Sequence, residues 1–110
     1  GLNTLKIGYS EKPEVRLENL VIYPNPFRPA ERGSVIIRND PTETMPRGLN
    51  QCRIYDSAGT LVRILEENKF ARFEWNGANA EGKACANGIY FVVVSDAKGN
   101  RRTGKIALLR

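Results

Sequence analysis

Side chains that could carry out catalysis are present in this sequence of 110 residues, but the groups that would activate them are missing. There are two cysteines, Cys52 and Cys85, and no histidine. A Ser-His-Asp or Cys-His site is therefore excluded, because no histidine can accept the proton of a nucleophile. Asp56 and Asp96 could form a carboxylate pair for glycoside hydrolysis, but both have the spacing of turn residues. We therefore predict that the chain is not an enzyme.

The surroundings of the two cysteines suggest structural roles. Cys52 and Cys85 lie among apolar residues typical of strands, and neither belongs to a CxxC pair. A zinc site is not expected, because such sites gather several cysteine or histidine ligands at short spacings. Two interpretations stay open: free thiols that pack as small hydrophobic side chains, or one disulfide in an exported domain.

The loop at residues 76–82 has side-chain oxygens at intervals, as a calcium-binding loop has. Its sequence is Asn-Gly-Ala-Asn-Ala-Glu-Gly, in which Glu81 supplies the single carboxylate. A tight calcium site normally needs several carboxylates. We therefore predict a tight turn and no cofactor, and calcium binding is the alternative.

The aromatic residues could form a platform on which a sugar ring stacks. Such a platform would combine Trp75 with Tyr23, Tyr55 and Tyr90. However, Trp75 alternates with charged neighbours and shares one face of its strand with Phe73. A single tryptophan in such an alternating strand is more often a core residue, and we predict that Trp75 lies in the core.

The excess of basic over acidic residues does not identify a partner. The formal net charge is +5 and the sequence pI is about 9.5, which could attract nucleic acid, anionic lipid or an acidic glycan. The densest group of cations is Lys98, Arg101, Arg102, Lys105 and Arg110, which a strand would divide between two faces. We therefore predict a solvated surface and no nucleic-acid partner. No apolar run approaches the ~20 residues of a membrane helix, so no membrane span is expected.

The elements that position these residues are short strands, rich in β-branched and aromatic residues and separated by Gly, Pro, Asn and Asp. The predicted strands are Leu5–Tyr9, Leu20–Tyr23, Ser34–Arg38, Gln51–Tyr55, Leu61–Leu65, Ala71–Trp75, Gly88–Ser95 and Arg101–Leu109. Residues 56–59 and 96–99 both read Asp-x-x-Gly, which suits a type I turn and predicts two hairpins. Both faces of the strand at 88–95 are apolar, which favours a central position in a sheet. Together these features predict an all-β sandwich or barrel.

Four motifs occur in a fixed order along the chain. The first is Tyr23-Pro24-Asn25-Pro26, the second is Ile54-Tyr55-Asp56 leading to Gly59, the third is Trp75-Asn76-Gly77, and the fourth is Gly88-Ile89-Tyr90 leading to Lys105–Arg110. In this order they resemble the immunoglobulin-like C-terminal sorting domains of the type IX secretion system. They also resemble the related C-terminal domain of the flagellar hook-capping protein. The family pattern has Asp where this chain has Asn76, and we expect aliphatic residues where it has Cys52 and Cys85.

The resemblance covers residues 20–110 and implies an immunoglobulin-like antiparallel β-sandwich of seven to eight strands. Residues 1–19 would be an N-terminal strand or a linker from an upstream domain. The implied function is a non-catalytic C-terminal sorting or attachment module of a larger exported bacterial protein. Its partner would be the secretion or surface-attachment machinery, or a neighbouring domain of the same polypeptide. Its location would be the outer-membrane surface or the extracellular space, reached through the periplasm.

The C-terminal strand, Arg101–Arg110, is the element through which we expect such a module to be recognised. An exposed edge strand offers unpaired backbone groups to which another chain can add a strand. The residues of this predicted recognition strand are Lys105, Ile106, Ala107, Leu108, Leu109 and Arg110. The alternative functions are a structural immunoglobulin-like module of an extracellular appendage or hook cap, and an accessory binding domain of a secreted hydrolase.

Overall fold

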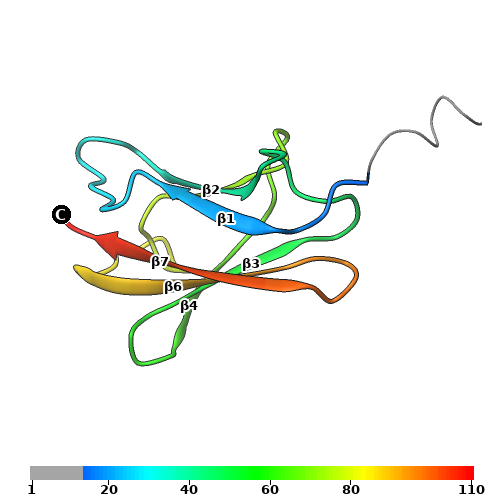
Figure 1. The fold of residues 1–110 in the computed structure, drawn as a ribbon. Coiled ribbons are helices and arrows are strands. Elements are labelled where there is room, and N and C mark those ends of the chain that lie inside the picture. The colour runs from blue at the N-terminus through cyan, green and yellow to red at the C-terminus, as the bar shows by residue number, and fades with distance from the viewer. Residues whose placement is uncertain (1–13) are drawn as a thin grey trace, which may run out of the picture.

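The computed structural model describes residues 14–110, which form two antiparallel β-sheets packed face to face (Figure 1). The strands are β1 (Asn19–Tyr23), β2 (Val35–Asp40), β3 (Gln51–Tyr55), β4 (Leu61–Leu65), β5 (Phe73–Trp75), β6 (Gly88–Ser95) and β7 (Arg101–Leu108). The three-stranded sheet has the order β1-β2-β5 and the four-stranded sheet has the order β4-β3-β6-β7. The predicted all-β sandwich is therefore confirmed, with an immunoglobulin-like strand arrangement. The strand predicted at residues 5–9 lies outside the described part of the chain.

The strand β6 is an inner strand of the four-stranded sheet, between β3 and β7, as its two apolar faces predicted. Its inward side chains, Tyr90, Val92 and Val94, are buried in the core. On the opposite face, the ammonium nitrogen of Lys105 lies 5.9 Å from the centroid of the Phe91 ring. A long side chain of the neighbouring strand therefore covers part of the face that the other sheet leaves open.

The strand β5 begins at Phe73, two residues later than predicted, because a turn around Asn68 extends to residue 72. The side-chain oxygen of Asn68 accepts hydrogen bonds from the backbone N–H groups of Phe70 (2.9 Å) and Arg72 (3.2 Å). Ala71 has a φ of 58° within this turn, which is a left-handed conformation that no strand can contain. The amide of Asn68 thus competes successfully with sheet pairing for these backbone groups.

Trp75 lies at the centre of the core and has no exposed surface. Its ring centroid is 5.3 Å from that of Tyr90, in an edge-to-face arrangement, and 6.4 Å from that of Phe27. The indole N–H donates a hydrogen bond of 2.8 Å to the carbonyl of Ala78, which satisfies its polar group. The predicted core position is confirmed, and the sugar-stacking alternative is wrong for Trp75 and Tyr90 because both are buried.

The two predicted Asp-x-x-Gly turns are present, and in each of them the aspartate holds the loop. The side chain of Asp56 accepts the backbone N–H of Ala58 (3.0 Å) and of Thr60 (2.9 Å). Asp96 does the same for Lys98 (3.0 Å) and Asn100 (2.8 Å). Slight burial tends to raise the pKa of Asp96, but the hydrogen bonds from Asn100 and Lys98 outweigh it and hold the pKa below its usual value.

The contacts of the sandwich begin upstream of residue 20. Leu17 is buried in the core, next to the start of β1. The buried amide of Asn39 on β2 fixes this segment, because it donates to the carbonyl of Arg16 (2.6 Å) and accepts from the N–H of Glu18 (2.9 Å). Residues 16–18 therefore pack as part of the sandwich, whereas a strand or linker further upstream stays a prediction. Residues 14–110 contain no helix long and apolar enough to cross a membrane.

Candidate functional site

The outer edge of β7 is covered in its C-terminal half by the segment that follows β1. The side-chain amide of Asn25 donates to the carbonyl of Lys105 (2.9 Å) and accepts from the N–H of Ala107 (3.0 Å). Two residues later, the N–H of Phe27 donates to the carbonyl of Ala107 (2.7 Å), and the N–H of Leu109 donates to the carbonyl of Phe27 (2.9 Å). The side chain of Asn25 and the backbone of Phe27 therefore act together as a short neighbouring strand.

The prolines on either side of Asn25 explain why the chain crosses from one sheet to the other. Pro24 and Pro26 have no N–H group, so this segment cannot extend the pairing of β1 with β2. The chain leaves the three-stranded sheet after Tyr23, and Phe27 then forms a parallel bridge with Leu108 of the four-stranded sheet. The first motif is therefore a crossing between sheets that ends against the C-terminal strand, as Figure 1 shows.

Arg110 is held by the loop between β5 and β6. Its backbone N–H donates to the side-chain oxygen of Asn87 (2.8 Å). Its guanidinium donates to the carbonyl of Cys85 (2.8 Å) and to that of Gly77 (2.8 Å). Gly77 has a φ of 82°, and a β-carbon at this position would lie 3.0 Å from the Arg110 guanidinium. Glycine thus gives the backbone its left-handed turn and leaves room for the arginine.

These contacts define a C-terminal clamp, made of Asn25, Phe27, Gly77, Cys85 and Asn87. Two further motif residues hold the loop that supplies part of it. The hydroxyl of Tyr90 donates to the carbonyl of Ala86 (2.6 Å), and the indole of Trp75 donates to that of Ala78. The structure therefore brings the first, third and fourth motifs together at residues 105–110, whereas Asp56 and Gly59 serve a hairpin turn. The sequence predicted the motif residues but not Phe27 and Cys85, which act through their backbone, or Asn87, which acts through its side-chain oxygen.

The prediction that residues 105–110 offer unpaired backbone groups is wrong for most of this segment. The carbonyl of Lys105, both backbone groups of Ala107 and the N–H of Leu109 are bonded to the clamp. The backbone N–H and C=O groups of residues 104, 106 and 108 alternate with these and point towards β6. The side chains of Ile106 and Leu108 are fully buried, so the outward side chains of this segment are those of Lys105, Ala107 and Leu109. Recognition through residues 105–110 stays a prediction, and it would depend on side chains.

Both cysteines are free thiols. Cys52 pairs with Val94 near the end of β6, whereas Cys85 precedes Gly88 at its beginning. The six steps along the strand from Gly88 to Val94 extend over about 20 Å, which is too far for a disulfide without rearrangement. Burial raises the pKa of Cys52 to about 12. Burial also raises the pKa of Cys85, although the Arg110 guanidinium opposes this, so neither thiol has the lowered pKa of a nucleophile.

We expect a soluble thiol reagent to modify Cys85 of the folded protein at least ~10-fold faster than Cys52, which becomes accessible only through unfolding. The folded pKa of Cys52 exceeds the value of about 8.5 in an unfolded chain. The free energy of unfolding should therefore fall as the pH rises from about 9 towards 12. Mass spectrometry of the labelled protein measures the rates, and urea unfolding measures the pH dependence. Cys52→Val should reduce that dependence more than Cys85→Ser does, because Cys52 is fully buried and Cys85 only partly; equal labelling rates would contradict the assignment.

The amide oxygens of the loop at residues 76–82 are engaged within the loop itself. The side chain of Asn76 accepts from the N–H of Ala78 (3.0 Å), and that of Asn79 accepts from Glu81 (3.0 Å) and Lys83 (2.9 Å). Within residues 14–110, no three His, Cys, Asp or Glu side chains gather in a way that could hold a metal ion. The arrangement is that of a tight turn, and independence from a cofactor stays a prediction.

The fold and the clamp define an immunoglobulin-like module whose C-terminal strand is held by its own sequence motifs. The sequence matches the family described as the secretion system C-terminal sorting domain over residues 21–108. The chain therefore belongs to this family of type IX secretion sorting domains, which confirms the resemblance of the four motifs. Domains of this family are sorting modules and in general are not catalytic.

Two solved structures from Porphyromonas gingivalis contain a similar domain. PorZ, an essential surface component of its type IX secretion system, is 27% identical over 83% of this chain and 11% of that protein, with a TM-score of 0.64. Dimeric latent PorU is 24% identical over 89% of this chain and 10% of PorU, with a TM-score of 0.53. At this identity, the similarity to PorU shows a shared fold only. The chain thus spans about a tenth of the length of these proteins. Among curated proteins, no sequence matches this chain.

Proposed function

We propose that this domain directs the polypeptide that carries it through type IX secretion, and that the secretion machinery recognises residues 105–110. The proposed destination is the outer-membrane surface or the extracellular space, reached through the periplasm. The proposed partners are the secretion or surface-attachment machinery, and no metal or cofactor takes part. The family match favours this function over a structural module of an appendage and over an accessory domain of a hydrolase.

The convergence of the motifs on one short segment is the observation that carries the proposal. Residues from three separate parts of the chain bind residues 105–110: Asn25 and Phe27, then Gly77, then Cys85 and Asn87. A terminal segment without such contacts would fray. A segment fixed in one geometry loses less conformational entropy when a partner binds it, which raises affinity without any additional contact.

A secretion assay with a truncated domain tests this proposal. The chain is fused behind a fluorescent reporter in Porphyromonas gingivalis, and the surface fraction is measured by added protease. The variant that ends at Leu108 loses Arg110 and the Leu109 N–H but retains the buried Ile106 and Leu108. We expect it to lower surface delivery at least ~10-fold, the change that a loss of about 1.4 kcal/mol of binding free energy produces.

A matched control removes the same residue types elsewhere. Arg47→Ala combined with Leu49→Ala takes one arginine and one leucine from an exposed loop, and this double variant should be delivered normally. Thermal melting of the purified variants shows whether they remain folded, and Arg110→Ala alone replaces the truncation if it does not. Normal delivery of a folded truncated variant would overturn recognition at residues 105–110. Failure of the unaltered fusion to leave the cell would overturn the sorting function itself.

A further inference from the structure

The outer face of the four-stranded sheet carries an apolar patch on the side opposite the core. Four large hydrophobic side chains are exposed there: Leu61 (44%), Ile64 (51%), Ile89 (44%) and Phe91 (37%). Strand register joins them across the sheet, because Tyr55 of β3 lies opposite Leu61 on one side and Phe91 on the other. The patch is therefore continuous across β4, β3 and β6.

Within the strands, the charges that accompany this patch are positive, and one carboxylate, that of Glu66, lies beside Ile64 directly after β4. The charged side chains at outward positions of β3, β6 and β7 are Arg53, Arg101 and Lys105, and these positions hold no aspartate or glutamate. Arg53 lies opposite Ile64, and Lys105 lies opposite Phe91. We call this surface the docking face; its residues are Arg53, Tyr55, Leu61, Ile64, Ile89, Phe91 and Lys105.

The outer face of the other sheet differs, because its strand positions hold carboxylates as well as an arginine. The guanidinium of Arg38 lies 3.8 Å from the carboxylate of Asp40 and 5.5 Å from the centre of the Tyr23 ring. Glu74 on the same face accepts a hydrogen bond of 2.8 Å from Asn68. Of the two outer sheet faces, the docking face is thus the one whose strand positions carry positive charge without carboxylates.

We infer that the docking face binds a protein of the secretion machinery whose surface has an apolar centre and acidic side chains around it. The inference rests on the proposed function and deepens it, because Lys105 belongs both to the recognition strand and to the docking face. Strand addition along residues 105–109 is blocked by Asn25 and Phe27. Side chains on the face of the sheet are the recognition surface that remains at this segment.

The composition and size of the face favour a protein over a lipid surface. Aromatic residues and arginine are enriched at protein interfaces. Binding to anionic membranes normally uses clusters of about 4–8 basic residues, whereas the docking face has two and Arg101 adds one at its margin. Strands about 4.8 Å apart and up to eight residues long give this sheet an area of roughly 15 by 25 Å. That area suits a small, transient interface, as a partner that releases its cargo requires.

The fluorescent-reporter assay in Porphyromonas gingivalis tests the inference with side-chain changes that leave the clamp intact. Phe91→Glu and Lys105→Glu should each lower surface delivery at least ~10-fold, because one places a charge in the apolar centre and the other reverses the complementary charge. Ile64→Glu, at the most exposed apolar position, is the second test if Phe91→Glu destabilises the fold. Thermal melting identifies any variant that is unfolded.

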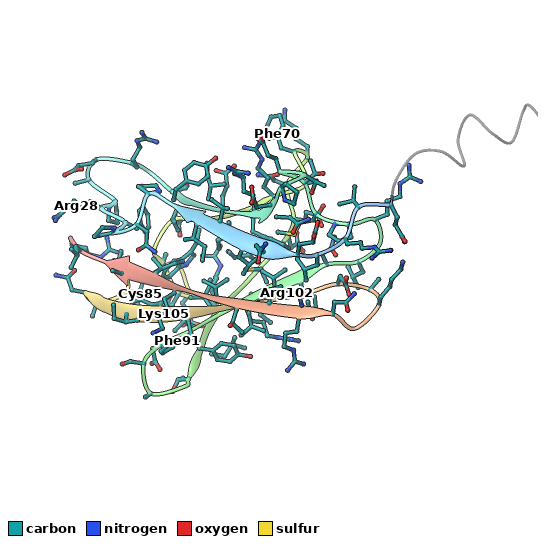
Figure 2. All side chains as sticks on the ribbon, viewed as in Figure 1. Arg28, Phe70, Cys85, Phe91, Arg102 and Lys105 are labelled. Carbon is teal, nitrogen blue, oxygen red and sulfur yellow. The ribbon has the colours of Figure 1, made fainter. Side chains whose placement is uncertain are left out.

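The chain offers a matched control on the opposite side of the sandwich, as Figure 2 shows. Phe70 is 61% exposed, and the ammonium nitrogen of Lys69 lies 5.3 Å from the centre of its ring. Phe70→Glu and Lys69→Glu therefore make the same chemical changes away from the docking face. We expect less than a ~2-fold effect from them, as is usual for surface substitutions outside an interface.

Three outcomes separate this inference from the proposed function. Normal delivery of folded Phe91→Glu and Lys105→Glu fusions, with the truncated variant blocked, would overturn the docking face and leave the sorting function standing. An unaltered fusion that stays inside the cell would overturn both. Loss of delivery for Phe91→Glu and Lys105→Glu, with Phe70→Glu and Lys69→Glu delivered, is the expected result.

Two further measurements identify the kind of partner. Free domain produced in the periplasm should compete with the reporter fusion for a saturable protein site, and free domain with Phe91→Glu should not compete. The absence of competition by the unaltered domain would overturn a protein partner. Sedimentation with phosphatidylglycerol vesicles should retain no protein; retention that Phe91→Glu abolishes would replace the protein partner with a lipid surface.

Discussion

Trp75→Ala is expected to lower the free energy of unfolding by about 3–5 kcal/mol, because it removes the largest fully buried side chain and leaves a cavity. Domains of this size have roughly 5–15 kcal/mol of stability in total. The variant should therefore be largely unfolded or close to it. The removed ring contacts Phe27 and Tyr90, so the loss reaches both the clamp and the strand β6.

Urea unfolding followed by circular dichroism measures this change without relying on fluorescence, since Trp75 is the single tryptophan. Trp75→Phe should have a smaller effect, because it retains a ring but loses the hydrogen bond to the carbonyl of Ala78. Phe70→Ala provides the control, because Phe70 is exposed and should change stability by no more than about 0.5 kcal/mol. A Trp75→Ala protein that unfolds at the same urea concentration as the original would contradict this account of the core.

Strands and turns could be predicted from the sequence because their signals are local. The alternation of Phe73 and Trp75 with charged neighbours predicted which side chains face the core, and both are fully buried. The aspartates of the two hairpins act within four residues of their own position. In such cases the residues that determine the structure lie within one short window, so general rules for turns and strands are sufficient.

The clamp could not be predicted because its contacts join distant parts of the chain. Asn25 and Lys105 are 80 positions apart, and the two prolines showed that the chain must turn without showing where it goes. In addition, Gly77 and Cys85 contribute backbone carbonyls, for which no residue type is diagnostic. The prediction of a free edge at residues 105–110 was wrong for this reason: it treated the last strand as having one neighbour.

Closing this edge has a physical consequence for a sorting domain. An unpaired edge strand is a template for aggregation. The side-chain amide of Asn25 binds the outward backbone groups of Lys105 and Ala107. The prolines beside Asn25 cannot donate hydrogen bonds that would extend the sheet further. The clamp therefore protects the C-terminal half of the strand from unspecific pairing while its outward side chains stay accessible.

Gly77→Ala is expected to lower the free energy of unfolding by about 1–3 kcal/mol, through two separate effects. Alanine is strained at the φ of 82° that this position requires. Its β-carbon would also lie 3.0 Å from the Arg110 guanidinium and 3.4 Å from the Phe27 ring, so the guanidinium must shift by a few tenths of an ångström, which weakens its hydrogen bonds in the clamp. Urea unfolding of the single variants and of the double variant with Arg110→Ala separates the two effects.

The double variant should be less destabilised than the sum of the single changes, by about 0.5–1.5 kcal/mol, because the alanine at position 77 can disturb the guanidinium only while Arg110 is present. Gly59→Ala is the matched control: its φ is 87°, and a β-carbon there would have no atom within 4 Å. It carries the same backbone strain without the contact, so its effect should add to that of Arg110→Ala within experimental error. If Gly77→Ala proved equally additive, Arg110 would not be held by Gly77, and the clamp would consist of Asn25, Phe27, Cys85 and Asn87.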